Sequence, residues 1–288
     1  MSGFSRHRYT TNSVRPCTYR GQPAVRKVFR ADATQMWATE REAYRVVASL
    51  DPPLAPRLFE ATSDASGHAL VMERIEGPTL DGHLVTLSEQ AREAVCRRLA
   101  RAVERFHTLG SVPPSFDPGG DRGLPPTDAW YRRLRSAAER LQQCGCQPQT
   151  LTRLAEWIDR RGASVAAVAP RGLIHRDLSL RNIVLDAKGE VRIIDWEVAT
   201  FGHADLDLAR LLWLELEDRA DLREAFYDEY APGDEVRRSA HHRAYFRAWF
   251  CVEMLEHLAG LLELTEEQRT FRARLVAELD RVCVSQGV

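Results

Sequence analysis

The chain has 288 residues, of which 44% are hydrophobic and 28% are charged, and its formal net charge is −1. This length and apolar content allow one unit with a sizeable core. The near-neutral charge argues against a nucleic-acid partner, and no apolar run is long enough to span a membrane. The first residues lack the apolar core of a secretion signal and the six cysteines have no metal-ligand spacing, so we expect a cytoplasmic protein with reduced thiols.

The first element with a clear pattern is a strand over residues 24–29. Alternation along this strand places Lys27 on the same face as Val25 and Phe29. An unpaired ammonium group among apolar side chains is costly. We therefore expect Lys27 to have an acidic partner.

A helix is predicted next, over residues 34–50. Its apolar stripe is expected to contain Met36, Ala43, Val46, Val47 and Leu50. The helix offers Glu42 as the partner of Lys27, and Glu40, which lies on another side of the helix, is the competing choice. The segments 56–60 and 69–77 complete this first part of the chain.

The rest of the chain is expected to be mainly helical. Apolar residues at helical spacing predict a helix that ends near residues 106–110, and a Pro- and Gly-rich loop follows at residues 112–126. Further helices are predicted over residues 128–143, 150–161, 206–216, 222–230, 237–262 and 266–283.

One segment interrupts the helices and carries the residues most suited to chemistry. A His-x-Asp-x-x-x-x-Asn loop runs from His175 to Asn182 and enters a short apolar strand, and a second apolar strand ends at Asp195. This arrangement is typical of the base and metal half of a phosphoryl-transfer site. Asp177 is placed to accept the proton of an incoming hydroxyl, while Asn182 and Asp195 offer the oxygen ligands that Mg²⁺ prefers. His175 is expected to support the loop backbone.

With these motifs the chain resembles the aminoglycoside phosphotransferase and choline kinase family of the protein kinase-like superfamily. The Asp-Trp-Glu at residues 195–197 is typical of this family, and residues 202–209 resemble its Gly-Asp-Pro-x-x-Asp-Leu-Ala motif. By that match Asp207 anchors the catalytic loop. Arg176 stands where the family usually has glycine, and we expect it to pair with a nearby acid.

The resemblance implies an α+β, protein kinase-like fold with two lobes. Residues 1–73 would form a small antiparallel-sheet N-lobe with one helix, which binds the nucleotide. Residues 74–77 would form a hinge, and residues 78–288 a mainly helical C-lobe with the catalytic loop and the acceptor site.

The resemblance also implies ATP as the phosphate donor and Mg²⁺ as the metal. Lys27 would touch the phosphates, and Glu42 would orient Lys27. Adenine would bind backbone groups near Glu73 and Ile75, with Met72 lining the pocket.

The loop that covers the phosphates departs from the common kinase pattern, because no G-x-G-x-x-G precedes the predicted lysine. The polar residues Thr11, Asn12 and Ser13 lie at the right place, and their backbone N–H groups and side chains would hold phosphate without glycines. The missing glycines leave a catalytically inactive, nucleotide-binding pseudokinase as an alternative.

The acceptor is expected to be a small molecule with a hydroxyl, such as an amino sugar or an antibiotic, because no Ala-Pro-Glu closes a peptide platform after Asp195. Residues 201–260 contain thirteen acidic and seven basic side chains, which would suit a cationic acceptor. Trp213, Tyr245 and Trp249 would stack on a sugar or bind an amine. The alternative acceptor is a Ser or Thr of a biosynthetic peptide, bound with a partner protein and recruited by the Pro- and Gly-rich loop.

Overall fold

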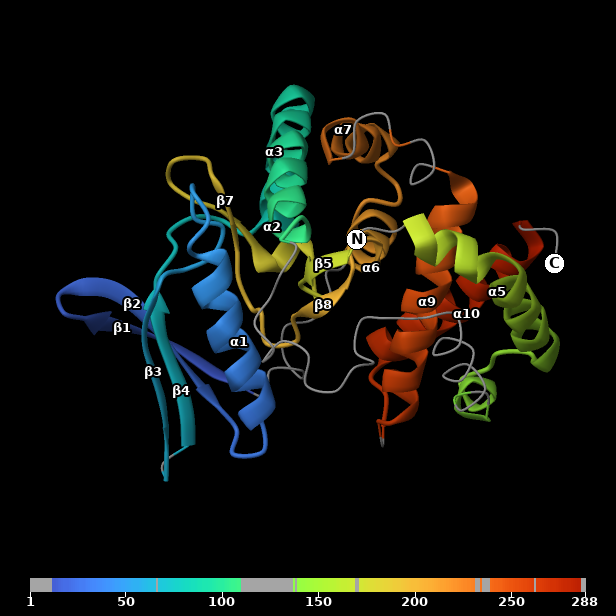
Figure 1. Ribbon diagram of the computed structural model, residues 1–288, viewed down its shortest axis with the longest axis horizontal. Coiled ribbons are helices and arrows are strands. Elements are labelled where there is room, and N and C mark those ends of the chain that lie inside the picture. The colour runs from blue at the N-terminus through green and yellow to red at the C-terminus, as the bar shows by residue number, and fades with distance from the viewer. Residues whose placement is uncertain are drawn as a thin grey trace.

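Two parts of the molecule lie side by side in the computed structural model, a sheet with one helix and a larger, mainly helical part (Figure 1). The structure describes residues 12–65, 67–109, 137, 139–168, 171–230, 234, 239–261 and 263–285. This arrangement confirms the expected α+β two-lobe architecture, while the exact lobe boundaries stay a prediction.

The N-terminal part is a four-stranded antiparallel sheet with the strand order β1-β2-β4-β3. Its strands are β1 (Ser13–Tyr19), β2 (Gln22–Phe29), β3 (Leu58–Asp64) and β4 (Gly67–Glu73). The turn between β1 and β2 consists of Arg20 and Gly21, whose φ angles are 49° and 79°. Two positive φ angles in succession match the right-handed twist of a hairpin, so this turn fixes the register that brings Lys27 into β2.

Helix α1 (Thr34–Val47) packs against the sheet. Its buried face contains Trp37, Ala43, Tyr44 and Val47, and the indole Nε1 of Trp37 donates a hydrogen bond to the carbonyl of Ala69 on β4 (3.2 Å). The aromatic residues therefore belong to the apolar stripe, which the sequence pattern had assigned to aliphatic residues alone. This rotation of the helix decides which acid faces the sheet.

The C-terminal part is built mainly from helices, as expected. They are α2 (Leu80–His83), η1 (Leu84–Thr86), α3 (Glu89–His107), α5 (Pro148–Val168), α6 (Asp205–Leu208), the π-helical η4 (Ala209–Glu215), α7 (Ala220–Tyr230), α9 (Ala240–Ala259) and α10 (Glu266–Ser285). Helix α3 begins where the hydroxyl of Ser88 accepts a hydrogen bond from Ala91 N. Helix α3 packs against α7, and α9 packs against α10 and α5. None of the described helices is long and apolar enough to cross a membrane.

Two short two-stranded antiparallel sheets lie between these helices and carry the catalytic loop, and the second of them is a hairpin. One pairs β5 (Arg171–Ile174) with β8 (Thr200–His203), and the other pairs β6 (Ile183–Leu185) with β7 (Val191–Ile193). Gly172 is required in β5, because a Cβ there would lie 1.8 Å from the carbonyl oxygen of His107 at the end of α3. Strand β5, which leads into the loop, is thereby held against α3.

The connection after β4 is attached to the second hairpin. Leu185 N donates a hydrogen bond to the carbonyl of Pro78 (3.0 Å), and Thr79 forms a bridge with Val184. Gly77 has a φ of 154°, and a Cβ there would lie 2.0 Å from the carbonyl oxygen of Leu185. Only glycine allows this close approach, so the segment between the lobes has a fixed path.

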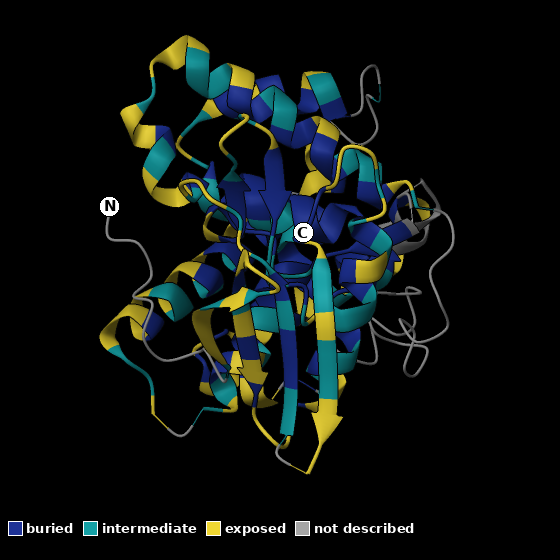
Figure 2. Cartoon of the chain, turned by 90° about the vertical axis from the view of Figure 1, so that its left-hand side faces the viewer, coloured by how far each residue is buried: buried dark blue, intermediate teal, exposed yellow. Residues whose placement is uncertain are grey.

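Two groups of buried apolar residues form the core, which occupies the middle of the molecule in Figure 2. The first runs from the sheet and α1 through α3 and the β6–β7 hairpin to α7, and it includes Leu70, Phe106 and Trp196. The second lies among α5, α9 and α10 and includes Tyr245 and Trp249. Because the first core continues through both lobes, it positions the catalytic loop relative to the sheet.

Candidate active site

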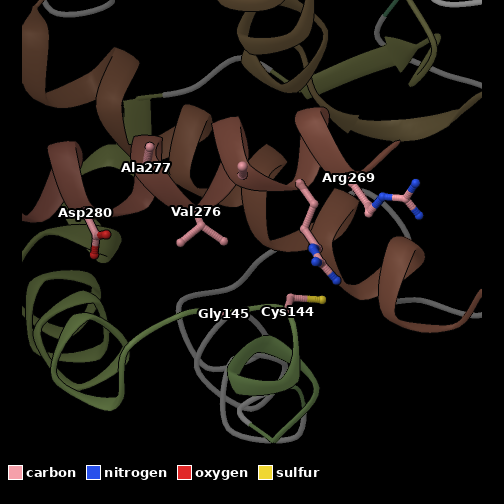
Figure 3. Close-up of a pocket in the computed structure, with 8 residues that line it drawn as sticks. Cys144, Gly145, Arg269, Val276, Ala277 and Asp280 are labelled. Atoms are coloured by element: carbon pink, nitrogen blue, oxygen red, sulfur yellow. The ribbon is translucent and has the colours of Figure 1, made fainter. Parts of the chain in front are cut away.

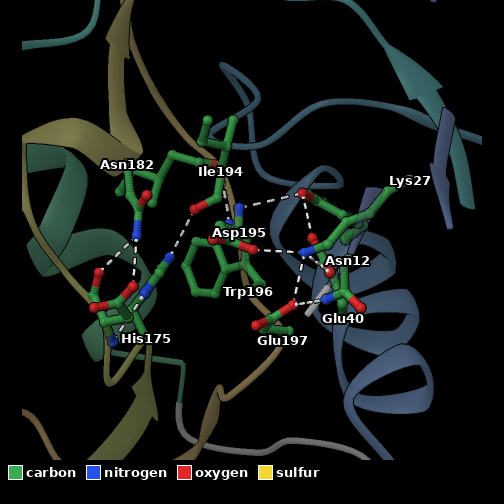
Figure 4. A network of polar contacts seen from close by, with 12 residues as sticks. Asn12, Lys27, Glu40, His175, Asn182, Ile194, Asp195, Trp196 and Glu197 are labelled. Atoms are coloured by element: carbon green, nitrogen blue, oxygen red, sulfur yellow. Dashed lines mark hydrogen bonds and ion pairs between the residues drawn. The ribbon is translucent and has the colours of Figure 1, made fainter. Parts of the chain in front are cut away.

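Lys27 lies at the centre of a group of three carboxylates, here called the Lys27 cluster. Its Nζ is 2.6 Å from Glu40 Oε2, 2.5 Å from Asp195 Oδ1 and 2.9 Å from Glu197 Oε2 (Figure 4). The lysine is 5% exposed, which confirms that it faces inward with apolar neighbours. Burial opposes its charge, but the three acids outweigh burial and raise the pKa of Lys27 above its ordinary value.

The predicted partner Glu42 was wrong. Glu42 bonds to Arg41 and Arg45 on the outer side of α1, whereas Glu40 is fully buried beneath the sheet. Glu40 lies one turn from both Trp37 and Tyr44, the aromatic residues of the buried face, so it turns inward with them. Burial raises the pKa of Glu40 to about 7, against the opposing charge of Lys27.

Tyr44 links the helix to the segment after β7. Its hydroxyl donates to Glu40 Oε1 (2.8 Å) and accepts a hydrogen bond from Asp195 N (3.3 Å). Asp195 has a φ of 69°, a left-handed conformation that Asp tolerates better than most residues. Trp196 then points into the core, where its indole is fully buried and packs against Phe106. The Asp-Trp-Glu motif therefore directs Asp195 and Glu197 to Lys27 on either side of a buried anchor.

The backbone of the catalytic loop is held by Asp207, as the resemblance implied. Its two carboxylate oxygens accept hydrogen bonds from His175 N and Arg176 N, both at 2.7 Å, and His107 Nε2 lies 3.1 Å from Oδ2. Burial alone would raise the pKa of Asp207, but the hydrogen bond and charge of His107 and the contacts with His175 hold it below its ordinary value. Because the described parts of α3, β5 and α6 meet at this carboxylate, it fixes the start of the loop.

His175 supports the loop from inside, which confirms its structural role. Its Nε2 donates to the carbonyl of Ile194 (2.9 Å), and its Nδ1 accepts a hydrogen bond from Asp177 N (3.2 Å). The ring thus connects the catalytic loop to the segment that carries Asp195. Arg176 has a φ of 66°, and its Nη2 donates to both carboxylate oxygens of Glu253 on α9 (2.8 Å each), so the expected acidic partner of Arg176 exists.

Asp177 and Asn182 face each other across the loop. Asn182 Nδ2 donates to the carbonyl oxygen of Asp177 (2.9 Å) and to its Oδ2 (3.0 Å). This orientation leaves the amide oxygen of Asn182 as the atom with which it would bind a metal. Ile194 N donates to the carbonyl of Asn182 (2.9 Å), so the backbone also connects the loop to the strand that leads to Asp195.

Two arginines contact the carboxylate of Asp177, and together with Asn182 these four residues are here called the Asp177 cluster. Arg210 Nη2 lies 2.6 Å from Asp177 Oδ1, and Arg181 Nη2 lies 3.3 Å from Oδ2. Burial would raise the pKa of Asp177, but the guanidinium groups of Arg210 and Arg181 outweigh burial and lower it. The carboxylate is therefore ionised and can act as a proton acceptor.

The residues predicted to bind adenine lie at the end of β4. Met72 is 4% exposed and belongs to the core, while Glu73 and Ile75 are half-buried. The N–H of Glu73 is already bonded to the carbonyl of Arg57 (2.9 Å), and its carboxylate lies 3.1 Å from Arg192 Nη2. The adenine-binding role of these residues stays a prediction.

The predicted phosphate-covering residues are only partly described. Ser13 begins β1 and is exposed, and the Nδ2 of Asn12 donates to Glu197 Oε2 (2.5 Å). Asn12 therefore lies next to the Lys27 cluster. Thr11 lies outside the described residues, as does the Pro- and Gly-rich loop at residues 112–126 that was considered for recruiting a peptide.

The three aromatic residues proposed to stack on an acceptor were predicted wrongly. Trp213, Tyr245 and Trp249 are 5%, 0% and 3% exposed, because they pack in the second core rather than on a surface. Several acids of the same helices are neutralised by arginines from elsewhere in the chain. The pairs are Glu253 with Arg176, Glu256 with Arg140, and Glu217 with Arg274 and Arg281. The excess of acids in residues 201–260 therefore does not produce an equally acidic cleft.

A shallow surface pocket of about 330 Å³ lies elsewhere, between the Cys144–Gly145 turn and helix α10 (Figure 3). Its lining includes Arg269, Val276 and Asp280, and no residue of the Lys27 or Asp177 clusters. Its position gives no reason to link it to the phosphoryl-transfer residues.

The fold and these two clusters define the class of kinase-like phosphotransferases, and comparisons with known proteins support this class. The model of the phosphotransferase enzyme family, APH, matches residues 9–244. The chain belongs to this family.

Solved structures of similar fold include aminoglycoside phosphotransferases and a choline kinase. A thermostable mutant of aminoglycoside phosphotransferase APH(4)-Ia is 17% identical, with 96% of this chain and 92% of that chain covered and a TM-score of 0.65. Choline kinase LicA from Streptococcus pneumoniae is 16% identical, with 98% and 92% covered and a TM-score of 0.64. At such identities the likeness shows the fold.

Among curated proteins, the serine/threonine-protein kinase PknD of Chlamydia trachomatis is 44% identical over 62 residues. The match covers 22% of this chain and only 6% of that protein. It therefore says little about the acceptor.

The sequence pattern did not predict the roles of Glu197, Arg181 and Arg210. Glu197 belongs to the Asp-Trp-Glu motif, and its place two residues after Asp195 was a usable signal. Arg210 follows the Asp-Leu-Ala motif in η4, and no local pattern connects it with Asp177. Only the packing of η4 against the catalytic loop brings these two residues together.

Proposed function

We propose that the protein transfers the γ-phosphate of ATP to a hydroxyl group of a small molecule, with Mg²⁺ as the metal. The observation that carries this proposal is that Asp177 and Asn182 are bonded to each other and lie next to the Lys27 cluster. A backbone hydrogen bond from Ile194 N to the carbonyl of Asn182 connects them to the segment of Asp195. Nucleotide complexes of the relatives support a purine nucleotide as donor, since the structures include an ADP-bound APH(2'')-Ib and LicA with AMP.

The side chains present fit a hard divalent ion. Glu40, Asp195 and Glu197 each offer a carboxylate oxygen, and these atoms lie within 4.8 Å of one another. Asn182 keeps its amide oxygen available because its Nδ2 is committed to Asp177. Asp195 and Asn182 would hold Mg²⁺, which when bound neutralises charge on the phosphates of the nucleotide.

The chain's own groups have separate tasks in this reaction. Asp177 accepts the proton of the acceptor hydroxyl at its carboxylate, and the carboxylate is kept charged for that purpose. Lys27 supplies positive charge to the phosphates and is oriented by Glu40, in place of the predicted Glu42. Residues Asn12 and Ser13, with Thr11, would cover the phosphates, and Met72, Glu73 and Ile75 would line the adenine site.

The test is a γ-phosphate transfer assay over a panel of amino sugars, nucleoside antibiotics, choline-like amines, hydroxy acids and candidate peptides, with and without Mg²⁺. Asp177→Asn and Asp177→Ala are expected to lower turnover by about 10²–10⁴-fold, because a general base is lost, while ATP binding remains. Asp221→Asn on α7, whose side chain is 50% exposed, is the matched control and should keep wild-type turnover.

Near-normal turnover of Asp177→Ala would remove the role of this residue. A Mg²⁺-dependent thermal shift with ATP but no phosphate transfer to any member of the panel would favour the pseudokinase alternative instead.

A further inference from the structure

The basic side chains next to the proposed catalytic carboxylate are not explained by nucleotide binding. Arg210 contacts Asp177 Oδ1, and Arg181 contacts Oδ2, the oxygen to which Asn182 Nδ2 also donates. Arg210 is 11% exposed and Arg181 46% exposed, so the first is built into the structure and the second extends into solvent. Arg176 does not join them, because it is occupied by Glu253.

Arg210 has an N–H group that is not used by the described residues. Its Nε is buried and has no hydrogen-bond partner among the described residues, although a buried unsatisfied N–H is costly. The Nε–H and Nη2 lie on the same edge of a guanidinium group, the edge that binds a carboxylate or phosphate through two parallel hydrogen bonds. The Cζ of Arg210 lies 5.8 Å from the centre of the Phe250 ring, which supports the guanidinium group from one side.

The Nε and Nη2 edge of Arg210 lies next to the proposed catalytic carboxylate. Nη2 contacts Asp177 Oδ1, and Asp177 is the group that must approach the acceptor hydroxyl. An anion bound at Nε and Nη2 would therefore lie beside that hydroxyl. It would also replace Asp177 Oδ1 in the ion pair with Arg210 Nη2, which frees Oδ1 to receive the proton.

We propose that the acceptor carries an anionic group, a carboxylate or a phosphate, within a few bonds of the hydroxyl that is phosphorylated, and that Arg210 is the residue that recognises it. Arg181 adds positive charge at the rim of the site. This inference rests on the proposed phosphotransferase function and assigns its substrate class.

A cationic acceptor fits these contacts less well. An ammonium group next to Asp177 would meet two guanidinium groups at short range. Glu215 is a further acid whose charge interacts with both Arg210 and Arg181. It is therefore a candidate for recognising a cation at this place, and it provides the opposing variant.

The experiment measures binding and phosphate transfer for four related probes with the full chain and Mg²⁺. Glucuronate and glucose 6-phosphate carry the two anions, glucose is neutral, and glucosamine is cationic. Binding is followed by calorimetry in the presence of Mg²⁺ and a non-hydrolysable ATP analogue, and transfer is followed with ATP. Wild type is expected to bind at least one anionic probe about 10- to 100-fold more tightly than glucose, the effect of a charge-assisted pair of hydrogen bonds.

Three variants locate the preference. Arg210→Gln should abolish the tighter binding of the anionic probes relative to glucose. Arg210→Lys should keep only part of this preference, because lysine lacks the paired N–H groups of a guanidinium group. Glu215→Gln should leave the preference unchanged. A thermal shift with Mg²⁺ and ATP on each variant shows that it is folded.

Equal binding of the anionic and neutral probes by wild type would overturn the proposal, as would a preference for glucosamine that Glu215→Gln abolishes. A drop in transfer by Arg210→Gln that is the same for every probe would also overturn it, because Arg210 would then act on the transferred phosphate. Arg210-dependent anion binding without transfer to any probe or to the wider panel would contradict the phosphotransferase proposal and leave the anion site standing.

Discussion

The Lys27 cluster and the Asp177 cluster have opposite charge patterns. In the first, one ammonium group is surrounded by three carboxylates, from Glu40, Asp195 and Glu197. In the second, one carboxylate is contacted by two guanidinium groups, from Arg181 and Arg210. The two clusters meet at the backbone between the catalytic loop and the segment after β7.

The difference indicates what each side of the site lacks. The Lys27 cluster has more negative than positive groups, which suits a divalent cation. The Asp177 cluster has more positive than negative groups in direct contact, which suits an anion on the acceptor. The first cluster also joins both lobes, whereas the contacts of Asp177 with other described residues come from the C-terminal lobe.

The largest expected effect is on stability, and it tests whether Asp207 holds the loop that carries Asp177. Asp207→Ala leaves the buried N–H groups of His175 and Arg176 without their acceptor, so we expect a loss of about 3 kcal/mol in the free energy of unfolding. Asp207→Asn keeps one carbonyl-type oxygen and should lose less. Urea denaturation measures both, and a loss below about 1 kcal/mol for Asp207→Ala would contradict the anchoring role.

The same carboxylate predicts a pH dependence. Its folded pKa is lowered, so its contribution to stability is fully present above the unfolded pKa of about 4 and is lost as the pH falls through the lower folded pKa. The difference in stability between wild type and Asp207→Asn should therefore shrink as the pH falls below about 4. A difference that stays constant down to about pH 2 would show that the charge of Asp207 does not contribute.

The next prediction separates the effects of Glu40 and Glu42, two glutamates of α1. Glu40→Gln removes one charge from the Lys27 cluster and should lower kcat/KM by about 10²-fold, because Lys27 loses the group that orients it. Glu42→Gln changes only pairs with Arg41 and Arg45 on the outer side of α1, and should change kcat/KM by less than about threefold. Steady-state kinetics with the best acceptor measures both. If both changes lowered kcat/KM equally, the assignment of Glu40 rather than Glu42 as the residue that orients Lys27 would be contradicted.

The smallest expected effect concerns Arg176, which pairs with Glu253 and not with Asp177. Arg176 has a φ of 66°, which glycine adopts without strain and alanine does not. Both Arg176→Gly and Arg176→Ala lose the ion pair with Glu253, so their difference reports the backbone strain. Thermal or urea unfolding should find the glycine variant more stable than the alanine variant by about 1 kcal/mol. A more stable alanine variant would show that the loop relaxes to another conformation.

Much of the site could be predicted because its residues are close in sequence. The spacing of Asp177 and Asn182 is set by one short loop, and the strand alternation that buries Lys27 is a local property of the backbone. The choice between Glu40 and Glu42 also had a local signal, because Glu40 lies one turn from the two large aromatic residues Trp37 and Tyr44. The prediction failed where the apolar stripe was drawn through aliphatic residues only.

The sequence by itself determined the residues proposed for the donor side, since they stand in motifs of short, fixed spacing, and the family resemblance of those motifs implied the two-lobe architecture that the structure confirms. Only the tertiary structure decided the remaining partners: Arg210 on Asp177, Glu253 on Arg176, and the burial of Trp213, Tyr245 and Trp249. These contacts join segments far apart in the chain, and their formation depends on how whole helices pack and rotate. A local pattern carries no information on that rotation, which is why the arginine contacts of Asp177 became visible only with the fold.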